Sequence, residues 1–402
     1  MQIDEWAIGQ RIAANRVRRG LTQEELAGLV GISLSLMKKI ESGDRPVTRF
    51  SQLVLFAQAL RIKDLRDLTG VPLPLMPDGT RGHPSADAVR AALMDQRRPT
   101  GEPPALVPLA QRIEQAWEAW QSPSPWRYAQ IGQALPTLIT EIRAAVSLHS
   151  GEARRQAFRE ASKLYQLVRT WTKRVGEHEL SLLAADRAIT MAMEADSPEL
   201  SGAASWNLAM ILSAQGHTDE ARAVVYQAIA ELEPLMDNAP QHRLAVWGGL
   251  HLLGATEAAR DDKDGDARRL LDTASKLGAQ TGETNHYRMV FGPTNIAIHG
   301  VSTMVEMGRT RDALVAAERV TIDNAPAVER RLSFHLEAAR CYTRMKNDAA
   351  AVLMIQRIHR ESPEELRYST LVRETLRELM GRRKPAIEPD LRPLLTAAGL
   401  PD

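Results

Sequence analysis

Apolar residues recur at helical spacing through the first seventy positions of the 402-residue chain. This spacing predicts five short helices, over about 4–18, 22–30, 33–43, 49–60 and 63–69. Thr22 is expected to begin the second helix with a capping box, because Glu25 follows three residues later. Ser33 is expected to cap the third, and Gly31 and Gly43 to end the second and third helices. Two short helices joined by a tight glycine-containing turn are typical of a helix-turn-helix.

A second pattern repeats in the C-terminal half. A turn followed by an alanine recurs every 46 residues, with the alanines at Ala221, Ala267 and Ala313. Mostly small residues stand about twelve positions before and seven after each alanine, where two helices of a hairpin would press together. Weaker copies flank these, near 176–195 and 347–363. The array resembles the tetratricopeptide repeat, whose period is about 34 residues, and predicts stacked hairpins with a concave inner surface.

Prolines gather between these two regions. Residues 71–125 hold 10 of the 22 prolines, and proline ends helices because it lacks a backbone donor. We therefore expect three parts: a DNA-binding domain at 1–70, a Pro-rich linker with short helices at 71–125, and a repeat domain for dimerisation or effector binding at 126–402. The linker is interpreted as a spacer, with a hinge between two DNA-binding heads as the alternative.

Composition favours helix and excludes several classes of protein. Aromatic residues make up only 4% of the chain, and Ala, Leu, Arg and Glu dominate, so an all-α fold is expected. No apolar run of about 18 residues indicates a membrane span. A single cysteine, Cys341, excludes an intrachain disulfide framework. With no basic-then-apolar leader, the expected location is the cytoplasm.

The net charge of +1 conceals an uneven distribution. Residues 1–70 hold 11 Lys and Arg against 8 Asp and Glu, whereas the remainder holds 40 against 42. The basic excess therefore lies where the helix-turn-helix pattern lies, as expected of a part that contacts phosphate.

Residue types and spacing within about 8–69 strengthen that interpretation. Arg16, the run from Leu21 to Ala27, and the segments Gly31-Ile32-Ser33 and Ile40-Glu41-Ser42-Gly43 resemble the Cro/C1-type (xenobiotic-response-element) helix-turn-helix family. The resemblance implies a five-helix DNA-binding domain whose third helix enters the major groove. It also implies that Arg16 and Glu41 form a structural ion pair rather than part of the site.

The same resemblance implies the DNA-contacting residues. The expected base readers are Ser33, Leu34, Ser35 and Lys38. Gln23 is expected to bind a phosphate or a neighbouring base, and further backbone charge is expected from Lys39, Arg45 and Arg49. The third helix lacks the Gln or Asn that reads adenine in several relatives, so no operator sequence is predicted.

Projection of the repeat assigns a candidate effector surface to the first helix of each hairpin. Its residues are Trp206, Met210, Thr256, Arg260, Asn295, His299, Ser302 and Glu306. An asparagine there could pair with the backbone of an extended peptide, since its amide both donates and accepts. For single residues a structural role is the stronger expectation, with Asn295 capping its own helix and Trp206 packing in the core.

These features predict a sequence-specific transcriptional regulator that binds a two-fold DNA operator as a homodimer. A helix-turn-helix head before helical repeats resembles the peptide-pheromone receptors of Gram-positive bacteria, which implies a peptide effector; a small molecule, or none, is the alternative. The chain has no H-E-x-x-H, phosphate-binding or dinucleotide-binding motif, so no enzyme activity, cofactor, metal or membrane partner is expected. The competing hypothesis is an adaptor or scaffold whose repeats bind another protein.

Overall fold

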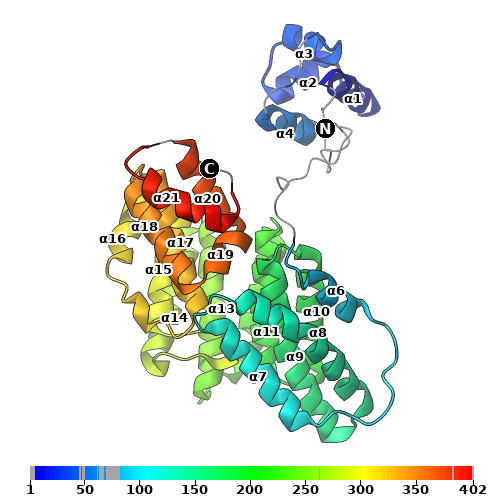
Figure 1. Cartoon of the computed structure of the whole chain (residues 1–402), viewed down its shortest axis with the longest axis vertical. Coiled ribbons are helices and arrows are strands. Elements are labelled where there is room, and N and C mark those ends of the chain that lie inside the picture. Colours follow the sequence, from blue (N-terminus) through cyan, green and yellow to red (C-terminus); the bar gives the residue numbers. More distant parts are fainter. Residues whose placement is uncertain are drawn as a thin grey trace. The chain divides into compact units, whose positions relative to one another are not determined.

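The computed structural model divides the chain into two compact units, Met1–Thr80 and Arg81–Asp402 (Figure 1). The described residues are 5–44, 47, 50–60, 62, 68, 82–261, 263–382 and 384–400. Within these residues every secondary-structure element is a helix, and the only β pairing is an isolated bridge between Thr284 and Phe291. The all-α prediction is confirmed.

Four described helices build the first unit. They are α1 (Glu5–Arg18), α2 (Gln23–Val30), α3 (Leu34–Glu41) and α4 (Phe50–Ala59). Their apolar faces share one core, in which Ile12, Leu26, Met37 and Phe56 are fully buried. The fifth predicted helix lies largely outside the described residues.

Local sequence signals fix the geometry of α2 and α3. Thr22 and Glu25 form the predicted capping box at the start of α2, and Gly31 ends it in the left-handed conformation, with φ of 73°. At the start of α3, Ser33 Oγ accepts the Leu36 N–H at 3.2 Å. Gly9 lets α1 approach α3, because a Cβ there would lie 2.0 Å from the carbonyl oxygen of Ile40.

The second unit is a curved array of antiparallel helix pairs. It begins with α6 (Ala86–Met94), α7 (Leu106–Gln121) and α8 (Arg127–Leu148). Five hairpins follow: α9 (Gly151–Arg174) with α10 (His178–Glu194), α11 (Pro198–Ala214) with α12 (Thr218–Leu232), α13 (Gln241–Arg260) with α14 (Asp264–Thr281), α15 (Pro293–Glu306) with α16 (Thr310–Ala317), and α17 (Val328–Arg344) with α18 (Asp348–Glu361). It ends with α19 (Pro363–Tyr368), α20 (Thr370–Gly381) and α21 (Glu388–Ala398).

The five hairpins share one turn geometry. In each, the residue before the second helix has φ between −95 and −84° and ψ between 54 and 73°. Its N–H donates to the carbonyl five residues earlier at 2.8–2.9 Å. The residue before it is left-handed wherever it is described, at Gly176, Gly216, Gly308 and Lys346. These turns explain why the sequence repeat is visible, since glycine adopts this conformation without steric cost.

Small residues occupy the position where each second helix crosses the first. Four residues after the turn, the equivalent side chains are all 0% exposed: Ser181, Ala221, Ala267, Ala313 and Ala351. The alanine repeat therefore marks a close helix–helix contact, and it extends to the two weaker copies that flank the three strongest.

The structure corrects the boundary of the predicted linker at 71–125. Both α6 and α7 belong to the second unit, where Val89, Leu93 and Ile113 are 0% exposed and pack with α8 and α9. The prolines between residues 82 and 125 lie before α6, around the start of α7 and after its end, positions that need no backbone donor. Within that described part of the segment, prolines therefore mark the ends of helices that belong to the second unit.

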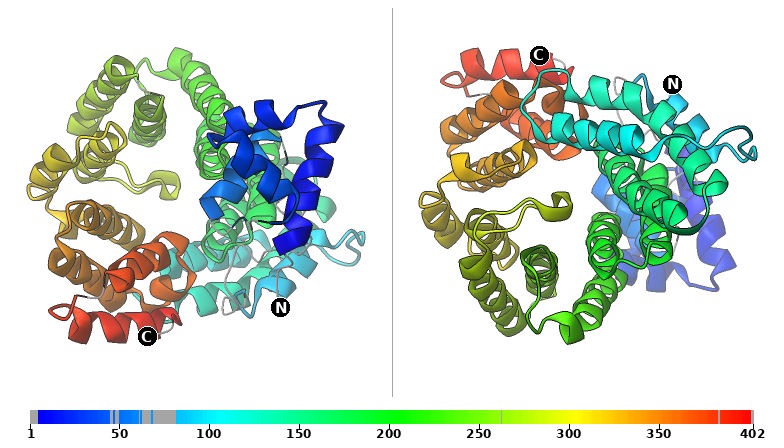
Figure 2. Two further views of the ribbon diagram at one scale, coloured as in Figure 1. Left: turned by 90° about the horizontal axis from the view of Figure 1, so that it is seen from above. Right: turned by 90° about the horizontal axis from the view of Figure 1, so that it is seen from below.

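Long-range polar contacts join the two ends of the array, and α7 and α8 lie beside α17 and α19 (Figure 2). Arg127, which is 0% exposed, donates to Glu365 Oε2 at 2.9 Å, and Tyr128 Oη donates to the same oxygen at 2.7 Å. Trp120 Nε1 donates to Glu329 Oε1 at 2.7 Å. These contacts, which we call the closure contacts, turn an open array into a closed one.

Candidate nucleic-acid interface and effector pocket

The outer face of α3 presents most of the predicted DNA-reading residues. Ser35, Lys38 and Lys39 are exposed, and Leu34 is half-buried. Ser33 is exposed, but its oxygen is occupied by the cap, so its hydroxyl keeps only its proton and one lone pair for a partner.

Two further predicted contacts, Arg45 and Arg49, lie outside the described residues.

A polar network fixes α3 against α1 and α2. Arg16 Nε and Nη2 donate to the two carboxylate oxygens of Glu41 at 2.7 and 3.0 Å, the bidentate structural pair that the sequence resemblance implied. The hydrogen bond to Glu41 raises the pKa of Arg16. Gln23 Nε2 also donates to Glu41, at 2.6 Å. Contact of Gln23 with DNA would therefore use its carbonyl oxygen or its second N–H.

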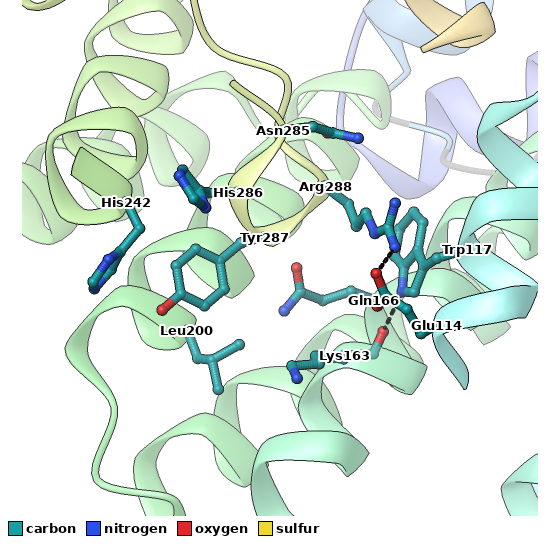
Figure 3. Close-up of a pocket in the computed structure, with 10 residues that line it drawn as sticks. All are labelled: Glu114, Trp117, Lys163, Gln166, Leu200, His242, Asn285, His286, Tyr287 and Arg288. Atoms are coloured by element: carbon teal, nitrogen blue, oxygen red, sulfur yellow. Dashed lines mark hydrogen bonds and ion pairs between the residues drawn. The ribbon is translucent and has the colours of Figure 1, made fainter. Parts of the chain in front are cut away.

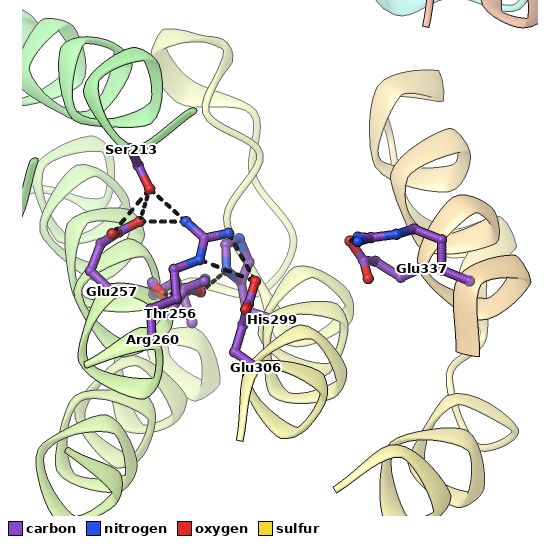
Figure 4. Close-up of polar contacts among 9 residues, drawn as sticks. Ser213, Thr256, Glu257, Arg260, His299, Glu306 and Glu337 are labelled. Atoms are coloured by element: carbon purple, nitrogen blue, oxygen red, sulfur yellow. Dashed lines mark hydrogen bonds and ion pairs between the residues drawn. The ribbon is translucent and has the colours of Figure 1, made fainter. Parts of the chain in front are cut away.

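On the inner face of the second unit, Arg260 of α13 is the centre of a charged network (Figure 4). Its guanidinium contacts Glu257 Oε1 and Glu306 Oε1 at 2.9 Å each, and Ser213 Oγ at 2.6 Å. Burial alone would lower the pKa of Arg260, but Glu306 and Glu257 raise it. The repeat pattern predicted that Arg260 and Glu306 lie on one face, and in the structure these two side chains form an ion pair with each other.

Thr256 and His299 also lie on this face, although neither is freely available. Thr256 is 7% exposed, and its Oγ1 donates to the Leu252 carbonyl at 3.2 Å and lies 3.4 Å from His299 Nδ1. Burial, with a smaller effect from Arg330, lowers the pKa of His299 to about 3. His299 is therefore neutral at physiological pH.

The remaining projected residues have structural surroundings. Asn295 is 3% exposed, and its amide nitrogen donates to the Val290 carbonyl at 2.6 Å, so it fixes the preceding loop. It does not cap α15, which begins after Gly292 without a side-chain cap. Trp206 is 6% exposed and packs in the α11–α13 core, to which the half-buried Met210 also contributes. Ser302 is half-buried on α15.

A cavity of about 470 Å³ opens beside this face, lined by residues that the sequence analysis did not single out (Figure 3). Its walls come from α7, α9, α11, α13 and the loop between α14 and α15: Glu114, Trp117, Lys163, Gln166, Leu200, His242, Asn285, His286, Tyr287 and Arg288. No single repeat contains this combination, so no local pattern in the sequence indicates it.

The loop that borders this cavity has an uncommon backbone. Tyr287, Arg288 and Val290 have φ of 51, 61 and 51°, a region that non-glycine residues rarely adopt. Arg288 forms an ion pair with Glu114 of α7, and Asn285 Nδ2 donates to Gln121 Oε1 at 2.7 Å. These contacts hold the loop against α7 despite the backbone cost.

Among the described residues, no group of His, Cys, Asp and Glu is arranged to hold a metal ion, and no helix is long and apolar enough to cross a membrane. Cys341 is 1% exposed and packs with apolar neighbours.

Residues 7–68 match the family model of a helix-turn-helix domain. Together with the capped α2–turn–α3 unit, this match identifies the N-terminal part as a helix-turn-helix domain, a class that places its second helix in the major groove of DNA. No curated protein matches the chain.

Several solved regulators are similar to the chain at low identity. PlcR from Bacillus thuringiensis, solved with the peptide PapR7 and DNA, is 12% identical; the match covers 87% of this chain and 99% of that one, with a TM-score of 0.31. ComR from S. thermophilus is 12% identical, with 69% and 94% covered and a TM-score of 0.20. ComR from Streptococcus suis is 14% identical, with 89% and 96% covered and a TM-score of 0.19. At these values the likeness alone assigns no activity to this chain.

Proposed function

We propose that this protein is a sequence-specific DNA-binding transcriptional regulator. The observation that carries the proposal is the helix-turn-helix unit, in which Ser35, Lys38 and Lys39 project unshielded from α3. In this proposal α3 enters the major groove, with Ser33, Leu34, Ser35 and Lys38 at base edges. Lys39, Arg45 and Arg49 contact the phosphate backbone, and Gln23 contacts a phosphate or a neighbouring base.

The regulator acts as a homodimer on a two-fold operator. A single small domain contacts too few base pairs to select a site, whereas two copies read half-sites about 34 Å apart. The first 70 residues or so read DNA, and the helical second unit dimerises. Its slight acidic excess suits a part that stays away from phosphate.

An effector, a peptide or a small molecule, binds at the inner face of the second unit. The cavity beside α9 supports this part of the proposal, because it combines apolar walls at Trp117 and Leu200 with polar groups at Gln166 and Tyr287. To regulate, the effector must bind two conformations of the protein unequally.

The test begins with selection of an operator from random DNA by the full-length protein. Lys38→Glu should then weaken operator binding in a gel shift by about 10- to 100-fold, the loss expected for one base-contacting cation. Lys276→Glu, an equal charge change at an exposed position of α14, is the matched control and should bind normally. Circular dichroism checks that Lys38→Glu stays folded. Unchanged binding by folded Lys38→Glu would refute the assigned interface.

A further inference from the structure

Three cations on the inner face of the second unit form no ion pair with a carboxylate of the described residues. Arg169 and Lys173 lie on α9, and Arg330 lies on α17; Arg169 is 3% exposed and the other two are half-buried. Ion pairs among the described residues satisfy the neighbouring guanidiniums of Arg174 and Arg260, but none reaches these three. Buried cations are ordinarily paired, because removing an isolated charge from water is costly.

Hydrogen bonding leaves donors of this cluster unused. Arg169 Nη2 donates to the Asn207 carbonyl at 2.8 Å, but its Nε is buried and has no partner among the described residues. Lys173 Nζ makes one bond, of 3.3 Å, to the backbone of α11. The Arg330 guanidinium lies 5.4 Å above the ring of Trp206, a cation–π contact that uses the face of the ring and provides no counter-charge.

The charges also act on one another, although they come from opposite sides of the array. Burial, reinforced by Arg169, Arg174, Arg260 and Arg330, lowers the pKa of Lys173 well below its usual value. Burial likewise lowers the pKa of Arg169 to about 9, against the opposing effect of Glu329. Glu329 is the carboxylate that acts on both Arg169 and Arg330, and it already accepts the indole N–H of Trp120. A positive excess therefore remains inside the array.

Helix α9 connects the cavity to this cluster. Lys163 and Gln166 of α9 line the cavity (Figure 3). Arg169 follows Gln166 by about one helical turn and so lies on the same face of α9. Gln166 Oε1 accepts from Asn207 Nδ2 at 2.8 Å, and the Asn207 carbonyl in turn accepts from Arg169. Hydrogen bonds through Gln166 and Asn207 thus link the wall of the cavity to Arg169.

We propose that Arg169, Lys173 and Arg330 form a binding site for an anionic group, a carboxylate or a phosphate, of a ligand that occupies the adjoining cavity. The inference rests on the effector part of the proposed function, because it names the chemistry that this part leaves open. A bound anion supplies the missing counter-charge and accepts the unused N–H donors.

The test uses the full-length protein and two probes, sodium citrate for carboxylate and sodium pyrophosphate for phosphate. Thermal unfolding is followed while each probe is titrated at an ionic strength held constant with sodium chloride. The wild type should show a saturable rise in Tm with at least one probe. Lys173→Met and Arg330→Met should weaken the apparent affinity by about 10- to 100-fold, the loss expected for a charged hydrogen bond. Arg268→Met, at an exposed position on α14, is the control and should respond like the wild type.

A second readout separates ligand binding from a structural role. Without probe, Lys173→Met should unfold at a higher temperature than the wild type, because it removes a repelled charge and keeps the apolar stem. If Lys173 instead stabilises the fold, this variant unfolds at a lower temperature, and the proposal is overturned. It is equally overturned if neither probe gives a saturable rise, or if both variants respond like the wild type. A response to one probe alone identifies the source of the anion.

Operator binding by the same samples distinguishes this inference from the proposed function. A protein that selects an operator but lacks the anion response overturns the anion site alone. If the protein responds to anions but its operator affinity is the same with and without the probe, the anion site stands and the effector role is overturned. Failure to select any operator contradicts the DNA-binding proposal and leaves the anion site standing.

Discussion

Glu365 offers a direct test of the contacts that close the helical array. The residue is 2% exposed, and its carboxylate accepts from Arg127 Nη2 at 2.9 Å and from Tyr128 Oη at 2.7 Å. It also pairs with Arg174. Burial raises the pKa of Glu365, but Arg174 and Arg127 lower it by more, so the group is ionised in the folded protein. Glu365→Gln keeps the shape and one acceptor of this side chain and removes its charge.

The expected cost follows from what the variant leaves behind. Two guanidinium groups, of which Arg127 is 0% exposed, lose their shared counter-ion in the interior. Removing one partner of a buried ion pair costs about 3–5 kcal/mol, because the remaining charge is uncompensated. Although Arg127 keeps its bonds to Ser362 Oγ and the Trp120 carbonyl, neither carries a charge.

Urea unfolding of the full-length protein, followed by far-ultraviolet circular dichroism, measures this cost. The control is Glu388→Gln, whose ion pair with Arg392 is 62–63% exposed on both sides and should be worth less than about 1 kcal/mol. A loss below about 1 kcal/mol in Glu365→Gln, equal to that of the control, would refute the buried closure contacts.

Three further changes test other parts of the structure. His83 is 5% exposed, and burial lowers its pKa to about 4, so between about pH 6.5 and 4 the unfolded chain binds a proton that the folded protein does not. The free energy of unfolding should therefore fall as the pH drops through this range. In urea titrations, His83→Gln should reduce the loss of stability between pH 7 and pH 5 by about 2 kcal/mol. An unchanged pH dependence would contradict a buried neutral His83. Lys346 is exposed and has a left-handed backbone, with φ of 61°. Lys346→Gly should therefore stabilise the protein by about 0.5–1 kcal/mol in thermal unfolding, whereas Lys346→Ala should not. Equal effects of the two variants would exclude the left-handed turn. Ala267 is 0% exposed at a helix crossing, so Ala267→Leu should cost about 1–3 kcal/mol by calorimetry, against about 0.5 kcal/mol or less for Ala279→Leu at an exposed position on the same helix.

Features determined by neighbours in sequence were predictable. The caps at Thr22 and Ser33 and the close contact at Ala267 depend on residues a few positions apart, so a repeated spacing reveals them. The Arg16–Glu41 pair spans 25 residues and came only from resemblance to a known family.

Features that depend on the path of the whole array were not predictable. Arg127 and Glu365 are 238 residues apart, and neither lies in a motif that names the other. The linker boundary was misplaced because proline reports where a helix ends, whereas the burial of Val89 and Leu93 depends on α8, more than thirty residues further on. The cation cluster likewise combines α9 with α17, and each contributes residues that look like an ordinary charged helix face.

The central claim is that α3 reads a specific DNA sequence for regulation. Recovery and sequencing of the genomic fragments from its own organism that the full-length protein binds tests this claim most directly. The account predicts one shared sequence with two-fold symmetry and half-sites about one helical turn apart, enriched by the wild type and lost with Lys38→Glu. Recovery of fragments without any shared sequence, by a protein that is folded and dimeric, would contradict it and favour the adaptor hypothesis.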